Sequence, residues 1–208
     1  MRPIRRPVGL TLVEVLVALA LWGLMTALMT QGLDVLLRSQ QQQTQRDQAQ
    51  SRLQASLSQW KSDLDQLDTS LNRFTPMDWN GRVLRWVRHS AAPAQGLRTV
   101  VAWTLKDGRW VRWQSEPVAR LSELQLAWQT ALVALEQTPG VADDGVAAQS
   151  WQVFFYRNDA WSNALSSAGP EQATPDAIRL QLELPAAGPW RGLIQWDWLR
   201  PTWSVNRS

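Results

Sequence analysis

The chain has 208 residues, with 21 Lys and Arg, 18 Asp and Glu, one histidine and no cysteine. This composition excludes disulfide frameworks, cysteine nucleophiles and zinc sites built from cysteines or several histidines. The formal charge of +3 comes from Arg2, Arg5 and Arg6, because the rest of the chain carries 18 charges of each sign. We therefore expect no nucleic-acid partner from the charge balance.

An apolar run from Leu10 to Met29 follows the basic N-terminus. It holds twenty residues, enough for a helix to cross a bilayer core of roughly 30 Å. Glu14 lies inside this run, where a carboxylate costs about 2.5–3.5 kcal/mol on insertion scales. We therefore expect Glu14 to have a positive partner. The arginines before the run favour a cytoplasmic N-terminus.

Two general interpretations of this segment stay open. One is a secretory signal peptide that is cleaved after Ala20, although a signal peptide seldom carries an acid in its apolar region. The other is a plain single-pass anchor, which leaves Glu14 without a role.

The segment Gly9-Leu10-Thr11-Leu12-Val13-Glu14 resembles the cleavage and methylation motif of type IV pilins and pseudopilins. In that family, prepilin peptidase cuts after the glycine and methylates the new N-terminal residue. The resemblance implies a leader over residues 1–9, cleavage between Gly9 and Leu10, and N-methylation of Leu10. It also places Glu14 at the fifth mature position, where the family glutamate serves assembly. Most members begin with Phe or Met instead of Leu.

A second apolar pattern follows the membrane segment. Apolar residues recur every three or four positions, as on one face of a helix; they are Ala49, Leu53, Leu57, Trp60, Leu64, Leu67 and Leu71. We predict one spine helix with a transmembrane half over residues 10–30 and an amphipathic periplasmic half over residues 31–74, ended at Thr75-Pro76. A free coiled coil is the alternative. The width of a sheet of about five strands is smaller than the length of this helical stripe. We therefore expect Ala49, Leu53 and Leu57 to stay uncovered by the sheet and to contact a partner helix.

Residues 75–208 change to short β-type runs and predict a β-rich globular domain. The expected strands are Arg82–Val87, Thr99–Leu105, Arg109–Gln114, Gln152–Arg157, Ile178–Leu184 and Leu193–Trp198. Asp107-Gly108 between two runs predicts a tight hairpin. Leu121–Glu136 is compatible with a strand or a helix, and residues 138–145 and 162–175 are expected loops. Asp143 and Asp144 suit calcium by chemistry, but two acids favour a solvated loop.

These elements predict an α+β, pilin-like fold, with a long N-terminal spine helix packed on an antiparallel sheet. Three stretches resemble minor pseudopilin J of type II secretion systems: Leu57–Leu67 with Asp63, Thr99–Val118, and Gln152–Ser162 followed by Pro175–Leu184. The resemblance implies a structural subunit in the pseudopilus tip, with the minor pseudopilins I, K and H and the major pseudopilin as partners. It implies a single-pass protein of the bacterial inner membrane whose C-terminal domain lies in the periplasm.

Two other functions stay open: a minor type IV pilin in pilus initiation, adhesion or DNA uptake, and an anchored periplasmic glycan-binding module. The latter would use tryptophans near the C-terminus (Trp190, Trp196, Trp198 and Trp203), although core packing is the ordinary role of tryptophan. No catalytic, cofactor or metal residue is assigned, because His89 is the single histidine and no phosphate-binding loop follows a strand. We expect no enzyme.

Overall fold

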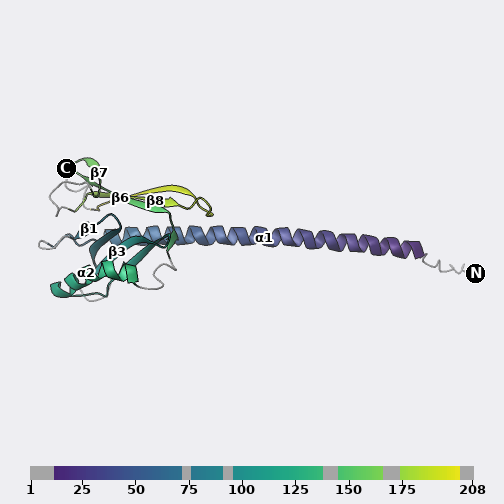
Figure 1. Cartoon of the computed structure of the whole chain (residues 1–208), viewed down its shortest axis with the longest axis horizontal. Coiled ribbons are helices and arrows are strands. Elements are labelled where there is room, and N and C mark those ends of the chain that lie inside the picture. The colour runs from purple at the N-terminus through teal and green to yellow at the C-terminus, as the bar shows by residue number, and fades with distance from the viewer. Residues whose placement is uncertain (1–11, 72–75, 91–95, 138–144, 166–173, 202–208) are drawn as a thin grey trace, which may run out of the picture. The chain divides into compact units, whose positions relative to one another are not determined.

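The computed structural model describes residues 12–71, 76–90, 96–137, 145–165 and 174–201. The chain divides into two compact units, residues 1–47 and 48–208. Helix α1 (Leu12–Asp65) begins in the first unit and ends in the second. Everything else that the structure describes belongs to the second unit, which holds the strands and helix α2 (Leu121–Gln137) (Figure 1).

The strands form two antiparallel sheets. The first sheet has the order β1-β2-β3-β4-β5 and the second the order β7-β6-β8-β9. Their bounds are β1 Met77–Trp79, β2 Val83–His89, β3 Arg98–Lys106, β4 Arg109–Gln114, β5 Val146–Ala147, β6 Ser150–Arg157, β7 Ala160–Asn163, β8 Ala177–Leu184 and β9 Gly192–Leu199. All six predicted strands are present, and three short edge strands (β1, β5 and β7) are additional.

The β3–β4 hairpin turns at Asp107 and Gly108, with Lys106 paired to Arg109. Both turn residues have positive φ, 50° for Asp107 and 70° for Gly108. A two-residue turn with both φ values positive matches the right-handed twist of the flanking strands, so the predicted tight hairpin is confirmed.

The last turns of α1 lie between the two sheets. Trp60 and Leu64 are fully buried in a core cluster that takes side chains from both sheets, such as Trp103 of β3 and Leu180 of β8. The indole of Trp60 lies 5.3–6.4 Å, between ring centroids, from four other tryptophan rings: Trp86, Trp103, Trp110 and Trp151. Edge-to-face ring packing at these distances is favourable, so tryptophan supplies the core of a domain without disulfides.

Helix α2 covers the opposite face of the first sheet. Leu124, Ala131 and Leu135 of α2 are buried against Val87, Val100 and Val111. The inward residues of α2 recur at helical spacing, which decides the open question about Leu121–Glu136 in favour of a helix. The unit therefore has the layers α2, first sheet, end of α1, second sheet (Figure 1).

The predicted α+β class is confirmed, with two corrections. Helix α1 ends at Asp65 instead of residue 74, because the chain then pairs with β2: Leu67 bridges Arg88, and the Asp68 amide donates to the Val87 carbonyl. The predicted loop over residues 162–175 is wrong at its start, because Ser162 and Asn163 belong to β7.

Candidate functional site

The N-terminal site residues are only partly within the described structure. Gly9 and Leu10 lie outside the described residues, so cleavage and methylation there stay predictions. Glu14 lies in the first turn of α1 and is exposed. A carboxylate in a first helical turn interacts favourably with the positive end of the helix dipole.

The first half of α1 presents apolar side chains all round. The described part of the chain contains one helix apolar and long enough to cross a membrane, with an 18-residue window of mean hydropathy 2.2. Its large apolar side chains are exposed; Trp22, for example, is 74% exposed and Met29 77% exposed. An exposed surface of this kind indicates contact with lipid or with other apolar helices.

The proposed partner-helix residues are more covered than expected. Ala49, Leu53 and Leu57 are each half-buried, and Leu53 and Leu57 pack against the core cluster around Trp60. The expectation of an uncovered stripe was based on a single sheet, whereas Leu53 and Leu57 pack against a core cluster that takes side chains from both sheets. Of the three, Ala49 is the one outside the core cluster.

A buried ion-pair network fixes the end of α1 to the first sheet. The carboxylate of Asp63, fully buried, accepts two hydrogen bonds from Arg112, at 2.6 and 2.9 Å, and one from the Trp103 indole at 3.3 Å. Gln59 donates a further bond at 2.9 Å. Arg88 approaches the same carboxylate at 3.4 Å. A buried carboxylate needs this degree of pairing, because an unpaired charge there is strongly destabilising.

Arg88 is the more buried arginine of this network. Burial lowers the pKa of its guanidinium, Arg112 acts in the same direction, and the negative charge of Asp63 opposes both. Arg88 also donates to the Gln66 side chain at 2.6 Å. The network therefore joins the last turn of α1 and the residue after it to β2, β3 and β4.

A second buried carboxylate, Asp68, lies just after the helix. It accepts hydrogen bonds from Arg98 at 2.7 Å and from the Ser70 amide at 2.8 Å. Burial raises the pKa of Asp68, but the hydrogen bonds from Ser70 and Arg98 and the nearby His89 outweigh that effect, so its pKa lies below the ordinary value. The side chain of His89 is 56% exposed, and its Nε2 lies 3.7 Å from the Asp68 carboxylate, which is beyond hydrogen-bonding distance.

Asp65 makes the corresponding contact to the second sheet. Its carboxylate accepts a hydrogen bond from the indole of Trp198 at 2.9 Å. The last turn of α1 thus holds both sheets, through Asp63 to the first and through Asp65 to the second.

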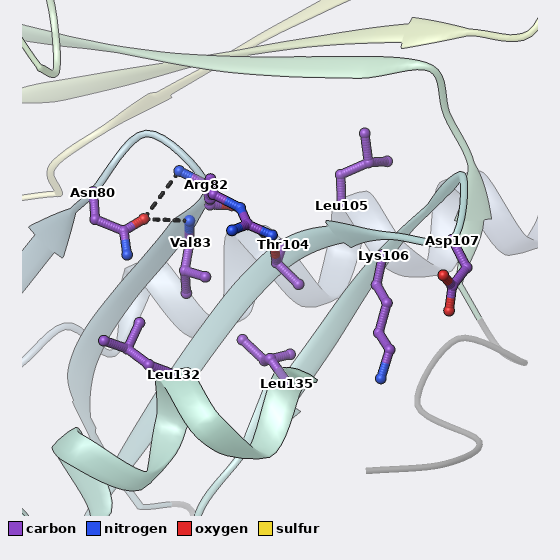
Figure 2. A pocket seen from close by; sticks show the side chains of 9 residues that line it. All are labelled: Asn80, Arg82, Val83, Thr104, Leu105, Lys106, Asp107, Leu132 and Leu135. Carbon is purple, nitrogen blue, oxygen red and sulfur yellow. Dashed lines mark hydrogen bonds between the residues drawn. The ribbon is translucent and has the colours of Figure 1, made fainter. Parts of the chain in front are cut away.

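A cavity of about 380 Å³ lies between the first sheet and α2 (Figure 2). Its lining combines apolar side chains, such as Val83, Leu132 and Leu135, with polar ones, such as Arg82 and Thr104. Asn80 accepts hydrogen bonds from the amides of Arg82 and Val83 and so fixes the turn beside it. A second cavity of about 270 Å³ lies beside α1, between Ser56 and Trp110.

The described tryptophans near the C-terminus differ in their exposure. Trp198 is buried, Trp196 packs against the core, and Trp190 is 45% exposed. Trp203, Asp143 and Asp144 lie outside the described residues. Within the described ranges, no group of three or more His, Cys, Asp or Glu side chains gathers to hold a metal ion.

The arginines of the Asp63 network were not identified from the sequence, although the strand pattern contained a signal. Arg88 shares a strand face with Leu84 and Trp86, and Arg112 shares one with Trp110. A charged residue in phase with buried positions indicates a buried pair.

Comparison with solved structures found proteins of similar fold. The chain is similar in fold to a type IV-like pilin from Thermus thermophilus, with a TM-score of 0.39 and 12% identity over 73% of this chain and 96% of that one. No family model and no curated protein matches the sequence.

Proposed function

We propose that this chain is the precursor of a pilin-like filament subunit, most similar to minor pseudopilin J of type II secretion systems. The observation that carries the proposal is the spacing of Gly9 and Glu14 at the head of an apolar helix. Prepilin peptidase would cut after Gly9 and methylate Leu10. The product would be a structural subunit, not an enzyme, and would support protein export across the outer membrane.

The proposed location follows from the same segment. The apolar half of α1 would cross the inner membrane once, with the leader arginines in the cytoplasm and the chain from residue 31 onward in the periplasm. This helix would leave the bilayer only on assembly, when contacts with neighbouring helices of the filament replace its contacts with lipid.

Glu14 has a specific task in this proposal. Its carboxylate would pair with the methylated α-amino group of Leu10 on a neighbouring subunit, because a carboxylate among apolar helices needs a positive partner. Glu14→Ala should insert in the membrane and be cleaved, but should be lost from the sheared filament fraction. Asp47→Ala, an exposed acid on the same helix, is the matched control. Equal incorporation of Glu14→Ala and wild type would contradict the pairing.

The end of α1 suits a subunit that bears force. Asp63 and Asp65 hold the helix to both sheets through hydrogen-bonded side chains. A displacement of the helix would therefore move the domain with it. This property is expected of a filament that pushes substrates toward an outer-membrane channel.

The face around Ala49, Leu53 and Leu57 stays the proposed contact for minor pseudopilin I. Because Leu53 and Leu57 also pack against the core, charged substitutions there would unfold the domain as well. Ala49→Asp is the sharper variant: it should abolish co-purification with minor pseudopilin I and leave the unfolding temperature unchanged. Leu57→Ala should lower the unfolding temperature. Full binding by Ala49→Asp would place the interface elsewhere.

A minor type IV pilin is the second candidate, since its precursor carries the same kind of motif. Co-purification of the full chain from its host separates the two. Recovery with the minor pseudopilins I, K and H favours the secretion system, and recovery with pilus subunits favours the pilus.

A further inference from the structure

The outer face of the second sheet, which points away from the Trp60 core, carries an ordered set of polar and aromatic side chains. The strand register places Gln152 opposite Gln181 and Gln181 opposite Gln195, so three glutamines form one row across β6, β8 and β9. Gln181 donates a hydrogen bond to Gln195 at 3.3 Å. Side-chain amides held in this way present donors and acceptors in fixed positions.

The next row holds the pair of Arg179 and Asp197, and the row beyond it holds Trp161, opposite Tyr156. Arg179 donates two hydrogen bonds to Asp197, at 2.8 and 2.7 Å, and its guanidinium lies 4.3 Å from the centre of the Trp161 ring. The ring of Tyr156 lies 5.3 Å from the same indole. Trp161 is nevertheless 37% exposed, so the indole keeps surface for a further contact.

The face carries little net charge. Arg179 and Asp197 neutralise each other, and the glutamine row is uncharged. The acid beside that row, Glu183 on β8, accepts a hydrogen bond from the Ser150 hydroxyl at 2.8 Å. Such a surface does not favour nucleic acid or a charged peptide. It favours a neutral ligand that has both C–H faces for an indole and hydroxyl groups for amides, which is the chemistry of a neutral sugar chain.

The spacing of the rows sets the length of that ligand. Tyr156, opposite Trp161, is four residues from Gln152 along β6. At about 3.3 Å per residue, the aromatic end and the glutamine row are roughly 13 Å apart. A ligand that contacts both must be a chain of several sugar units. Figure 1 shows no described helix over this face of the sheet.

We propose that the outer face of the second sheet binds a neutral oligosaccharide, with Trp161 stacked on a sugar ring and Gln152, Gln181 and Gln195 bound to hydroxyl groups. This site is independent of filament assembly. It also differs from the tryptophan platform expected near the C-terminus, since Trp196 and Trp198 point into the core.

The test uses the full chain in lipid nanodiscs, so that no glycosidic detergent competes. The probes are hexamers of β-1,4-linked glucose and of β-1,4-linked N-acetylglucosamine, titrated by calorimetry. At least one hexamer should bind with saturation. Trp161→Ala should weaken that binding about tenfold, Gln181→Ala should weaken it by a smaller factor, and Trp161→Phe should restore part of it.

Trp128→Ala is the matched control, because Trp128 on α2 is also stacked by an arginine, with Arg85 4.5 Å from its ring. Circular dichroism identifies the variants that are folded. If Trp161→Ala or Trp128→Ala unfolds, Trp161→Phe and Gln181→Ala still test the site. Unchanged affinity in Trp128→Ala or in Gln129→Ala, an exposed glutamine of α2, supports the site. Absence of saturable binding to both hexamers, or equal loss in the Trp161, Gln181 and control variants, overturns it.

Discussion

Arg112 donates two hydrogen bonds to the fully buried carboxylate of Asp63, at 2.6 and 2.9 Å. The two residues lie 49 positions apart in the chain, on α1 and on β4. This bidentate pair links the end of the long helix directly to β4, an inner strand of the first sheet. Its geometry gives the strongest class of side-chain hydrogen bond.

We predict that Asp63→Ala lowers the free energy of unfolding by about 3–5 kcal/mol, because it leaves Arg88 and Arg112 without their shared counter-charge. Chemical denaturation of the full chain, followed by tryptophan fluorescence, measures this change. The matched control is Asp197→Ala, which breaks an arginine pair whose side chains are about one third exposed. That variant should lose less than about 1 kcal/mol. Equal losses in both variants would show that the Asp63 network does not secure the helix.

Trp60 is the central side chain of the larger core. We predict that Trp60→Ala costs about 3–5 kcal/mol, as expected for removal of a buried aromatic ring. Its indole nitrogen is buried and has no hydrogen-bond partner among the described residues. Trp60→Phe should therefore cost less than half as much, because it keeps an aromatic ring and removes a buried donor without a partner. Thermal unfolding of Trp60→Ala and Trp60→Phe measures this difference in stability. A Trp60→Phe variant as unstable as Trp60→Ala would contradict the prediction.

The sequence predicted the large elements because their signals are local. Each of these signals depends on residues that are close in the sequence. They are the alternation of apolar and polar residues in Ile178–Leu184, the Asp107-Gly108 turn and the helical stripe through Trp60. The division into two sheets depends on contacts between distant segments, so the cover over Leu53 and Leu57 was not foreseen. The early helix end has the same origin, because Leu67 leaves the helix to pair with Arg88 on β2.

The candidate sites divide in the same way. Glu14 was singled out by its position in an apolar run, and that position lies in the first turn of α1. The pairing of Asp63 with Arg112 and Arg88 required the tertiary fold. So did the outer row of glutamines, because Gln152, Gln181 and Gln195 come from three separate strands.

The lowered pKa of Asp68 predicts a loss of stability in acid. A carboxyl group whose folded pKa lies below its unfolded value of about 3.9 stabilises the fold at any pH above that value. This contribution is lost as the pH falls through the folded pKa, so the window lies below about pH 4. Asp68→Asn should be less stable than wild type at neutral pH and should lose less on acidification.

Unfolding measurements across the acid range test this prediction. Asp107→Asn makes the same chemical change at an exposed turn, where asparagine tolerates the positive φ, and should follow the wild-type acid profile. Parallel profiles for Asp68→Asn and wild type would mean that Asp68 does not contribute to the acid dependence.

The central claim is that Gly9 ends a leader that prepilin peptidase removes. Intact-mass analysis of the membrane protein from its native host tests it most directly. The predicted species lacks Met1–Gly9 and carries one added methyl group on Leu10, and replacement of Gly9 by a bulky residue should leave only the precursor. A full-length N-terminus in the wild-type protein, or a cut after Ala20, would contradict the assignment.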